Sequence, residues 1–147
     1  MARILFVCTF NAARSPIAAA LLKRHSGLQY EVDSAGIFSD EVDPFAVATM
    51  AELGVDLADH EGRTLSDLDP ADYAVAIALS PEANRAARAW KGAAACHMEV
   101  WPIADPGAIE GNRDERVAAY RAIREDLLRR IRRRFDGARG RGASEGA

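Results

Sequence analysis

The chain has 147 residues, of which 49% are hydrophobic and 28% charged, and its formal net charge is −3. This composition is typical of one globular domain, and the charge excludes a general attraction to nucleic acid or to an anionic membrane. The apolar run over residues 4–7 is too short for a signal peptide or a membrane span, so we expect a cytoplasmic protein. We also expect the protein to be a monomer or a weak dimer.

The N-terminal third predicts a strand, a helix and a second strand. Residues 4–7 form a continuous apolar run, which is typical of a central parallel strand. A helix is predicted over about 15–25, because Ser15 and the proline after it form a helix-start signature. A weakly alternating strand over 28–32 then ends in a glycine-containing turn over 33–36.

The remaining elements continue the alternation of helices and strands. A helix is predicted over 44–53, a strand over 74–79 and a helix over 81–90. A fourth strand is predicted over 98–103, and apolar residues at three- and four-residue steps predict a long amphipathic helix over 112–135.

Four strands that alternate with helices predict an α/β fold of three layers, with a doubly wound, four-stranded parallel sheet. We expect one catalytic domain over residues 1–137 and a disordered C-terminal tail over 138–147, which is rich in Gly, Ala and Arg. Ligands bind such sheets beyond the carboxyl ends of the strands. Cys8 follows the first predicted strand and Asp105 the fourth, so both are expected at one crevice.

The loop between the first strand and the first helix carries the candidate chemistry. Cys8 and Arg14 stand there with five residues between them. A helix N-terminus directs unpaired N–H groups and a positive dipole at this loop, which favours a thiolate and a bound oxyanion. The arginine can bind two oxygens of that anion. The predicted phosphate-binding residues are Thr9, Phe10, Asn11, Ala12, Ala13 and Arg14. The alternative is a buried structural cysteine and a surface arginine.

Asp105 is the candidate proton donor. Transfer of phosphate to a thiolate requires an acid for the leaving oxygen, and a carboxyl group on a loop can supply it. Pro106 favours an extended conformation at Asp105, and Gly107 lets the loop approach a substrate. The alternative is an Asp-Pro-Gly turn with no chemical role. No cofactor is expected, and no Cys/His cluster has the spacing of a metal site.

Four segments together resemble the low-molecular-weight protein tyrosine phosphatase family, and the resemblance extends from Arg3 to Phe135. The segments are Val7-Cys8-Thr9-Phe10-Asn11-Ala12-Ala13-Arg14-Ser15-Pro16, Asp33-Ser34-Ala35-Gly36, Ala71-Asp72 and the stretch from Trp101 to Asp105-Pro106. The resemblance implies the phosphotyrosine phosphatase I-like fold, a phosphocysteine formed on Cys8, phosphate binding by Arg14, and Asp105 as acid and then base. It also implies that the substrate is a phosphorylated protein or a small aryl phosphate, with no metal.

Three further polar residues belong to the candidate site: Ser15 is a candidate for a catalytic role, and Asn11 and Ser34 are candidates for supporting roles. The Ser15 hydroxyl can donate a hydrogen bond to the Cys8 thiolate and help it to leave in the second step, and the alternative is a simple helix cap. Asn11 tolerates left-handed backbone angles and can connect the loop to Ser34 by hydrogen bonds.

The chain departs from the pattern of the family at three places. Phe10 stands where the family commonly has glycine, and it either narrows the pocket, stacks on an aromatic ring or forms a wall without selectivity. Ala13 stands where a second cysteine is frequent, so Cys8 lacks a neighbouring thiol to protect it from further oxidation. Gly107 and the two residues after it replace tyrosines that often follow the Asp-Pro pair.

Two other functions remain open at the level of sequence. Arsenate reductases that use thiols share this fold and loop, but their relay requires further cysteines, and only Cys96 is left, which we expect to be a buried core residue. An external thiol can substitute for them. The third possibility is a non-catalytic oxyanion-binding module. The three histidines are interpreted as residues of helix ends or of the surface.

Overall fold

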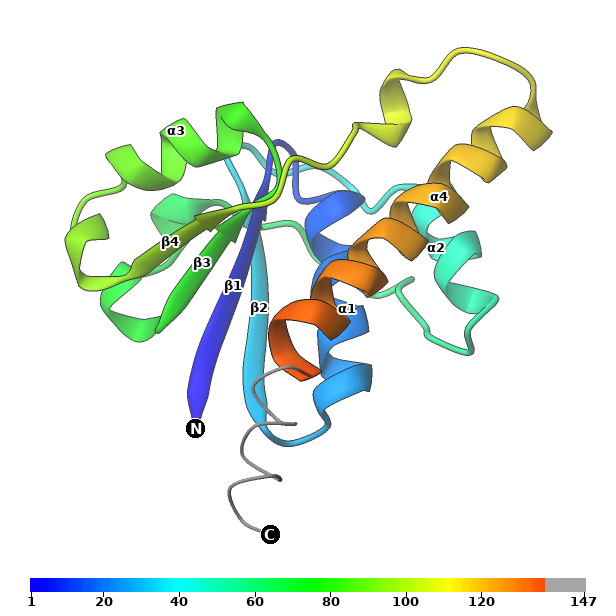
Figure 1. The fold of residues 1–147 in the computed structure, drawn as a ribbon. Coiled ribbons are helices and arrows are strands. Elements are labelled where there is room, and N and C mark those ends of the chain that lie inside the picture. The colour runs from blue at the N-terminus through cyan, green and yellow to red at the C-terminus, as the bar shows by residue number, and fades with distance from the viewer. Residues whose placement is uncertain (137–147) are drawn as a thin grey trace, which may run out of the picture.

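The computed structural model describes residues 1–136, which form a four-stranded parallel sheet in the order β2-β1-β3-β4 (Figure 1). The strands are β1 (Ala2–Cys8), β2 (Tyr30–Gly36), β3 (Val75–Ala78) and β4 (His97–Val100). The predicted three-layer, doubly wound α/β fold is therefore confirmed. Residue 137 and the predicted tail over 138–147 lie outside the described residues.

Helices cover both faces of the sheet. The helices α1 (Arg14–Ser26), α2 (Pro44–Ala51) and α4 (Arg113–Ile131) contribute to the core on one face, and α3 (Pro81–Ala89) covers the other (Figure 1). In α4 the predicted apolar positions from Tyr120 to Ile131 are buried. None of the described helices is long and apolar enough to cross a membrane.

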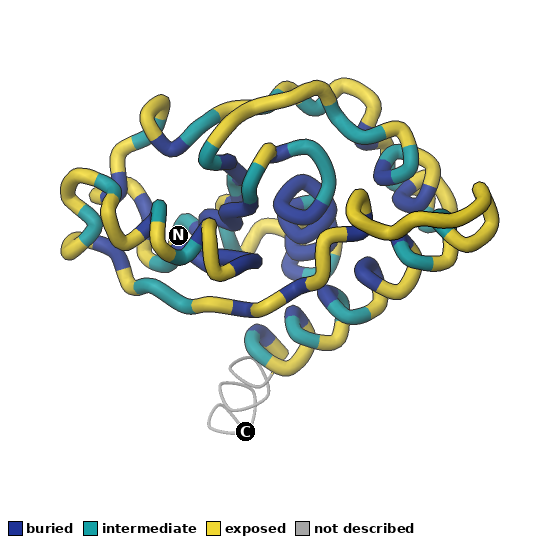
Figure 2. Tube along the Cα trace, turned by 90° about the horizontal axis from the view of Figure 1, so that it is seen from above, coloured by how far each residue is buried: buried dark blue, intermediate teal, exposed yellow. Residues whose placement is uncertain are grey.

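The alternation of side chains along β1 explains its continuous apolar run. Ile4, Phe6 and Cys8 belong to the core that α1 and α4 share, whereas Leu5 and Val7 belong to the core under α3. Because successive side chains of a strand point to opposite faces, a central strand covered on both sides needs apolar residues throughout. Seen from above, the strands and α1 are largely buried, whereas α4 and the outer loops alternate between buried and exposed residues or are exposed (Figure 2).

The second strand is longer than the sequence predicts. The turn expected over 33–36 is wrong, because β2 pairs with β1 in a register that runs from Ala2 opposite Tyr30 to Cys8 opposite Gly36. Asp33 is therefore a strand residue, and its carboxylate accepts hydrogen bonds from Arg3 at 3.0 Å and from the Tyr73 hydroxyl at 2.7 Å. The longer strand brings Gly36 level with Cys8.

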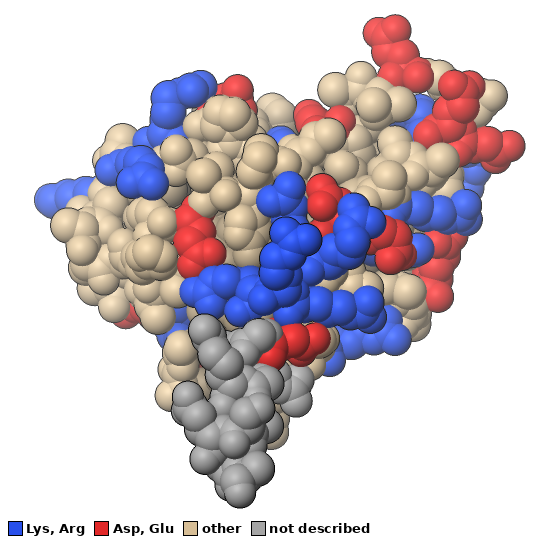
Figure 3. All heavy atoms as spheres, in the orientation of Figure 1, with Lys and Arg blue, Asp and Glu red and all other residues tan. Residues whose placement is uncertain are grey.

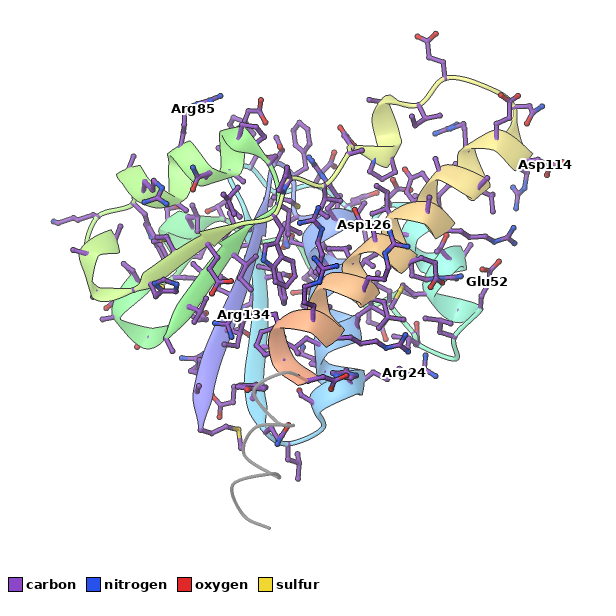
Figure 4. All side chains as sticks on the ribbon, viewed as in Figure 1. Arg24, Glu52, Arg85, Asp114, Asp126 and Arg134 are labelled. Carbon is purple, nitrogen blue, oxygen red and sulfur yellow. The ribbon has the colours of Figure 1, made fainter. Side chains whose placement is uncertain are left out.

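The basic residues at the end of α4 lie on one surface of the molecule. Figure 3 shows that Lys and Arg side chains gather over this part of α4. Three of the arginines have acidic partners: Arg129 and Arg130 pair with Asp126 at 3.6 and 3.2 Å, and Arg134 pairs with Glu99 at 2.8 Å. Asp126 and Arg134 are labelled in Figure 4. The pair of Arg134 with Glu99 attaches the π-helical turn Arg132–Asp136, which follows α4, to the edge strand β4.

Candidate active site

The loop after β1 turns its carbonyl groups outward and leaves its N–H groups free. Each carbonyl from Cys8 to Ala13 accepts a hydrogen bond from outside the loop or from the following helix. The donors, in that order, are Ile37 N at 3.1 Å, Phe38 N at 2.9 Å, Asp40 N at 3.1 Å, His60 Nε2 at 3.0 Å, Asp43 N at 2.9 Å and Ile17 N at 3.0 Å. Within residues 1–136, the N–H groups of residues 9–13 have no protein acceptor. Converging backbone N–H groups of this kind form an anion-binding concavity.

Asn11 holds the loop in its curved form. Its φ of 54° is in the left-handed region, and its side chain is fully buried. The amide Nδ2 donates to the Ser15 and Ser34 hydroxyls, at 2.8 and 2.9 Å, and Oδ1 accepts from the backbone N–H of Arg63 at 3.0 Å. An asparagine tolerates this conformation, and its side chain here bonds to three separate segments of the chain.

The sulfur of Cys8 has one polar neighbour. Cys8 is 2% exposed, and its Sγ lies 2.9 Å from the Ser15 Oγ. Because Asn11 already donates to that oxygen, the proton of the Ser15 hydroxyl is directed to the sulfur or to the Ala35 carbonyl, which lies farther away at 3.4 Å. The predicted role of Ser15 as the helix cap is wrong: the N-cap of α1 is Ala13, and no side chain bonds there.

The Arg14 guanidinium is fixed from two sides. It is 8% exposed, with Nη1 donating to the Ile103 carbonyl at 3.0 Å and Nη2 to the Thr9 hydroxyl at 3.3 Å. The Ile103 N–H in turn donates to Leu79, so the chain beyond β4 is tied to the end of β3. These bonds place a planar cation beside the loop in a set orientation, which suits binding to two oxygens of one anion.

Cys8, Arg14 and Asp105 line one cavity of about 560 Å³. Phe10, Ala12 and Ala13 line it too. The other predicted site residues, Thr9, Asn11, Ser15 and Ser34, lie outside its lining. The structure thus brings the sulfur, the guanidinium and the carboxylate to one opening at the carboxyl end of the sheet.

Two carboxylates of this cavity differ in their surroundings. Asp105 is exposed, and its Oδ1 accepts only from the Gly107 N–H at 2.9 Å, where it caps a short turn. Asp43, which the sequence did not single out, caps α2 and accepts from the Tyr120 hydroxyl. Burial and this bond to Asp43 raise the pKa of Tyr120, so the phenol remains a donor. Asp43 thus accepts hydrogen bonds from the Phe45 N–H and the Tyr120 hydroxyl, whereas Asp105 accepts one, from within its own turn.

His60 is a further residue of the site that the sequence does not reveal. Its Nε2 lies 3.0 Å from the carbonyl of Asn11 and 3.2 Å from its side-chain oxygen, although 49 positions separate the two residues. The interpretation of this histidine as a surface residue is therefore wrong. Burial lowers the pKa of His60, although the hydrogen bond to Asn11 acts in the opposite direction.

We expect His60→Gln to flatten the pH dependence of stability in mildly acidic solution. Because the folded pKa of His60 is lowered, the unfolded chain takes up the proton first, and this group costs stability as pH falls below about 6.5. Denaturant unfolding at several pH values measures the effect. The control is His97→Gln, in a side chain that is 66% exposed. Equal slopes in His60→Gln and the wild type would contradict the expectation.

Gly36 packs against the backbone of the loop after β1, and we expect Gly36→Ala to displace that loop. A Cβ at this position would lie 2.2 Å from the Phe38 carbonyl oxygen and 2.8 Å from the Asn11 nitrogen. Backbone atoms cannot yield cheaply, so we expect a loss of about 2 kcal/mol in the free energy of unfolding. Gly27→Ala is the comparison, since there a Cβ meets nothing within 4 Å and only the φ of 57° is strained. Equal losses in the two variants, measured by denaturant unfolding, would exclude the clash.

Among residues 1–136, no group of three or more His, Cys, Asp or Glu side chains is arranged to hold a metal ion. The cavity brings together a thiol, a guanidinium, backbone N–H groups and a carboxyl group.

Comparisons with known proteins agree on the family. The family model for low molecular weight phosphotyrosine protein phosphatase matches residues 3–136. An arsenate reductase of Halalkalibacterium halodurans is 32% identical over 132 residues, which cover 88% of this chain and 91% of that protein. A glutaredoxin arsenate reductase of Synechocystis is 26% identical over 131 residues, which cover 89% and 94%. The solved structure of the YwlE arginine phosphatase from Geobacillus stearothermophilus has a TM-score of 0.78 at 26% identity and covers 98% of this chain and 97% of that one. The chain therefore belongs to the low molecular weight phosphotyrosine protein phosphatase family, a class of cysteine-based enzymes that includes both phosphatases and arsenate reductases.

Proposed function

We propose that this protein is a phosphatase that hydrolyses aryl phosphate monoesters, with phosphotyrosine as the type of substrate, through a phosphocysteine on Cys8. The observation that carries the proposal is the cavity lined by Cys8, Arg14 and Asp105 together with the loop residues Phe10, Ala12 and Ala13, whose N–H groups have no acceptor within residues 1–136. A nucleophile, an oxyanion site and a proton donor are the three parts that this reaction requires.

In the first step, the Cys8 thiolate attacks phosphorus while the phosphate oxygens are bound by the loop N–H groups and by Arg14. The S–P bond forms as the P–O ester bond breaks. The electron pair of that bond leaves with the phenolic oxygen, and the protonated carboxyl group of Asp105 gives that oxygen its proton. The products of this step are the free phenol and the phosphocysteine.

In the second step, water attacks the phosphocysteine. The Asp105 carboxylate, deprotonated in the first step, takes a proton from the water as the new P–O bond forms and the S–P bond breaks. The sulfur leaves as a thiolate, and the Ser15 hydroxyl, 2.9 Å away, donates a hydrogen bond to it. Inorganic phosphate is released, and both Cys8 and Asp105 return to their starting protonation states.

The position of the second cysteine supports hydrolysis over an internal thiol relay. Cys8 is the last residue of β1, whereas Cys96 immediately precedes β4. Because the strands are parallel, the two cysteines lie at opposite ends of the strands, Cys8 at the carboxyl end and Cys96 at the amino end. They also belong to the cores on opposite faces, and burial raises the pKa of the Cys96 thiol. The sequence contains no third cysteine. A disulfide requires Cα atoms within about 7 Å, so Cys96 does not suit a relay with Cys8.

The second candidate is arsenate reduction with an external thiol, which the names of the similar arsenate reductases favour. The Cys8 thiolate would attack arsenate, with loss of water, to form a thiol ester of arsenic(V). A small external thiol would then attack the Cys8 sulfur, so that a mixed disulfide forms, two electrons pass to arsenic and arsenite leaves. A second external thiol would release Cys8 from the disulfide.

Parallel rate measurements on the purified protein test the proposal. We expect release of phosphate from a phosphotyrosine peptide that is insensitive to a metal chelator, and a lower rate of arsenite formation with glutathione and glutaredoxin. The panel includes a phosphoarginine peptide, because the similar YwlE is named an arginine phosphatase. Cys96→Ser is the control and should leave the phosphatase rate unchanged.

Each other result has a defined meaning. Arsenate turnover far above the phosphatase rate would replace the proposal with the second candidate, and faster hydrolysis of phosphoarginine than of phosphotyrosine would overturn the aryl assignment. Phosphate binding without turnover of any substrate would indicate an oxyanion-binding module.

A further inference from the structure

Two phenylalanines form an exposed pair beside the nucleophile. Phe10 is 49% exposed and Phe38 is 59% exposed, and their ring centroids lie 5.9 Å apart with an angle of 31° between the planes. Adjacent exposed aromatic rings form an apolar surface that can bind a further ring. Phe10 also lines the cavity that contains Cys8 and Arg14, so one edge of this surface belongs to the candidate active site.

The backbone fixes the position of both rings. The segment that follows β2 runs along the loop, with Ile37 N donating to Cys8 O, Phe38 N to Thr9 O and Asp40 N to Phe10 O, at 3.1, 2.9 and 3.1 Å. These bonds hold the backbone of Phe38 beside that of the loop. A surface held in this way loses little conformational entropy when a ligand binds to it.

The opposite side of the cavity lacks such a surface. Gly107 lines it there, next to Asp105, and Ala108 follows in the same short turn. The cavity does contain Phe45, but the Arg116 guanidinium already covers one face of that ring, 4.5 Å from its centroid. Of the two phenylalanines that line the cavity within residues 1–136, Phe10 is therefore the exposed one, and the ring of Phe38 extends its surface.

The acidic residues of the cavity restrict the charge of that ring. Asp40 and Glu41 are exposed and line the same opening. Carboxylates that line the cavity of the phosphate site disfavour a leaving group that carries its own negative charge.

We propose that Phe10 and Phe38 bind the aromatic ring of the substrate. They make the site prefer phosphate esters whose leaving group is an aryl group without a negative charge of its own. This role deepens the proposed phosphatase function and rests on it. Both phenylalanines act on specificity, because they contact the leaving group and contribute no reacting atom.

Two phosphonates of equal charge measure this role without turnover. Phenylphosphonate and methylphosphonate carry the same anionic group, and only the first has a ring. We expect the wild type to bind phenylphosphonate roughly threefold to tenfold more tightly than methylphosphonate, as measured by calorimetry. In Phe10→Ala and Phe38→Ala this ratio should fall towards one, and in Phe10→Tyr it should be restored.

The control variant is Leu28→Ala. Leu28 is 89% exposed and lies between α1 and β2, at the amino end of the strands, whereas Cys8 lies at the carboxyl end. Its replacement should therefore leave the affinity ratio unchanged. Affinity for methylphosphonate separates recognition from damage to the loop, since a displaced loop weakens both ligands equally.

Kinetics provide the second measurement. We expect Phe38→Ala to raise KM for a phosphotyrosine peptide roughly threefold while KM for a phosphoserine peptide changes little. A wild type that shows no preference for the ring, or variants that weaken both phosphonates equally, would overturn the role of the two phenylalanines. A preference for phenylphosphonate in a protein that hydrolyses no aryl phosphate would instead overturn the proposed function alone.

Discussion

Cys8→Ser is expected to reduce phosphate release from aryl phosphates by roughly a thousandfold or more. A serine hydroxyl at this position is a much poorer nucleophile than a thiolate, and the cavity offers no general base that is hydrogen-bonded to it: its one polar neighbour is the Ser15 hydroxyl. Steady-state rates with an aryl phosphate measure the loss. Rapid quenching of the wild type should also trap a phosphoryl group on the peptide that contains Cys8.

The same variant should still bind inorganic phosphate. The free N–H groups of the loop and Arg14 do not depend on the sulfur, so calorimetry is expected to find affinity close to that of the wild type. Cys96→Ser is the matched control, because it removes the other thiol of the chain, and it should keep full activity. Full activity in Cys8→Ser would exclude a phosphocysteine mechanism.

Asp105→Asn is expected to slow hydrolysis by roughly a hundredfold to ten-thousandfold when the leaving phenol is a poor one. The amide keeps an oxygen for the Gly107 N–H, which now bonds to Asp105 Oδ1 at 2.9 Å, so the short turn should stay intact. It has no carboxyl proton to give to the leaving oxygen. The loss should therefore be larger for phenyl phosphate than for p-nitrophenyl phosphate, whose phenolate leaves without protonation.

Asp114→Asn provides the comparison for this prediction. Asp114 is an exposed carboxylate in the first turn of α4, away from the lining of the cavity (Figure 4). We expect it to have wild-type rates with both substrates. If Asp105→Asn slowed both substrates by the same factor, Asp105 would position the substrate and would not be the proton donor.

The parts of the fold that the sequence predicts depend on local patterns. The apolar run of β1 follows from burial on both faces, and the long C-terminal helix follows from apolar residues repeated at helical spacing. The loop is also local, since Cys8 and Arg14 are separated by only five residues and a strand and a helix flank them. Each of these predictions depends only on residues that are close together in the sequence.

The contacts that the sequence does not predict join distant segments. His60 reaches Asn11 over 49 positions, and the Tyr120 hydroxyl reaches Asp43 over 77. No periodicity marks either pair, because their proximity arises only when the sheet and its helices assemble. The extent of β2 is likewise set by pairing with β1, which overrides the local turn signal.

Ser15 illustrates a different limit. A serine before a proline at the start of a helix has the same sequence pattern whether it caps the helix or lies two positions further in. Here α1 begins at Arg14, so the Ser15 side chain points to the Cys8 sulfur and does not cap the helix. A shift of two residues in the helix start thus changes the partner of the hydroxyl, and the boundaries of helices are the least predictable feature of a sequence.

In the segment from Ile37 to Asp43, the backbone and the side chains have separate functions. Its amides hold the carbonyls of the loop in place, at Cys8, Thr9, Phe10 and Ala12, and any residue except proline supplies such an amide. Apart from Asp43, whose side chain caps α2, the side chains along this stretch are therefore free to change during evolution without moving the phosphate site. Point substitutions in this segment could therefore change the substrate that the protein accepts. Insertions or deletions would instead shift the amides and so disturb the phosphate-binding loop after β1.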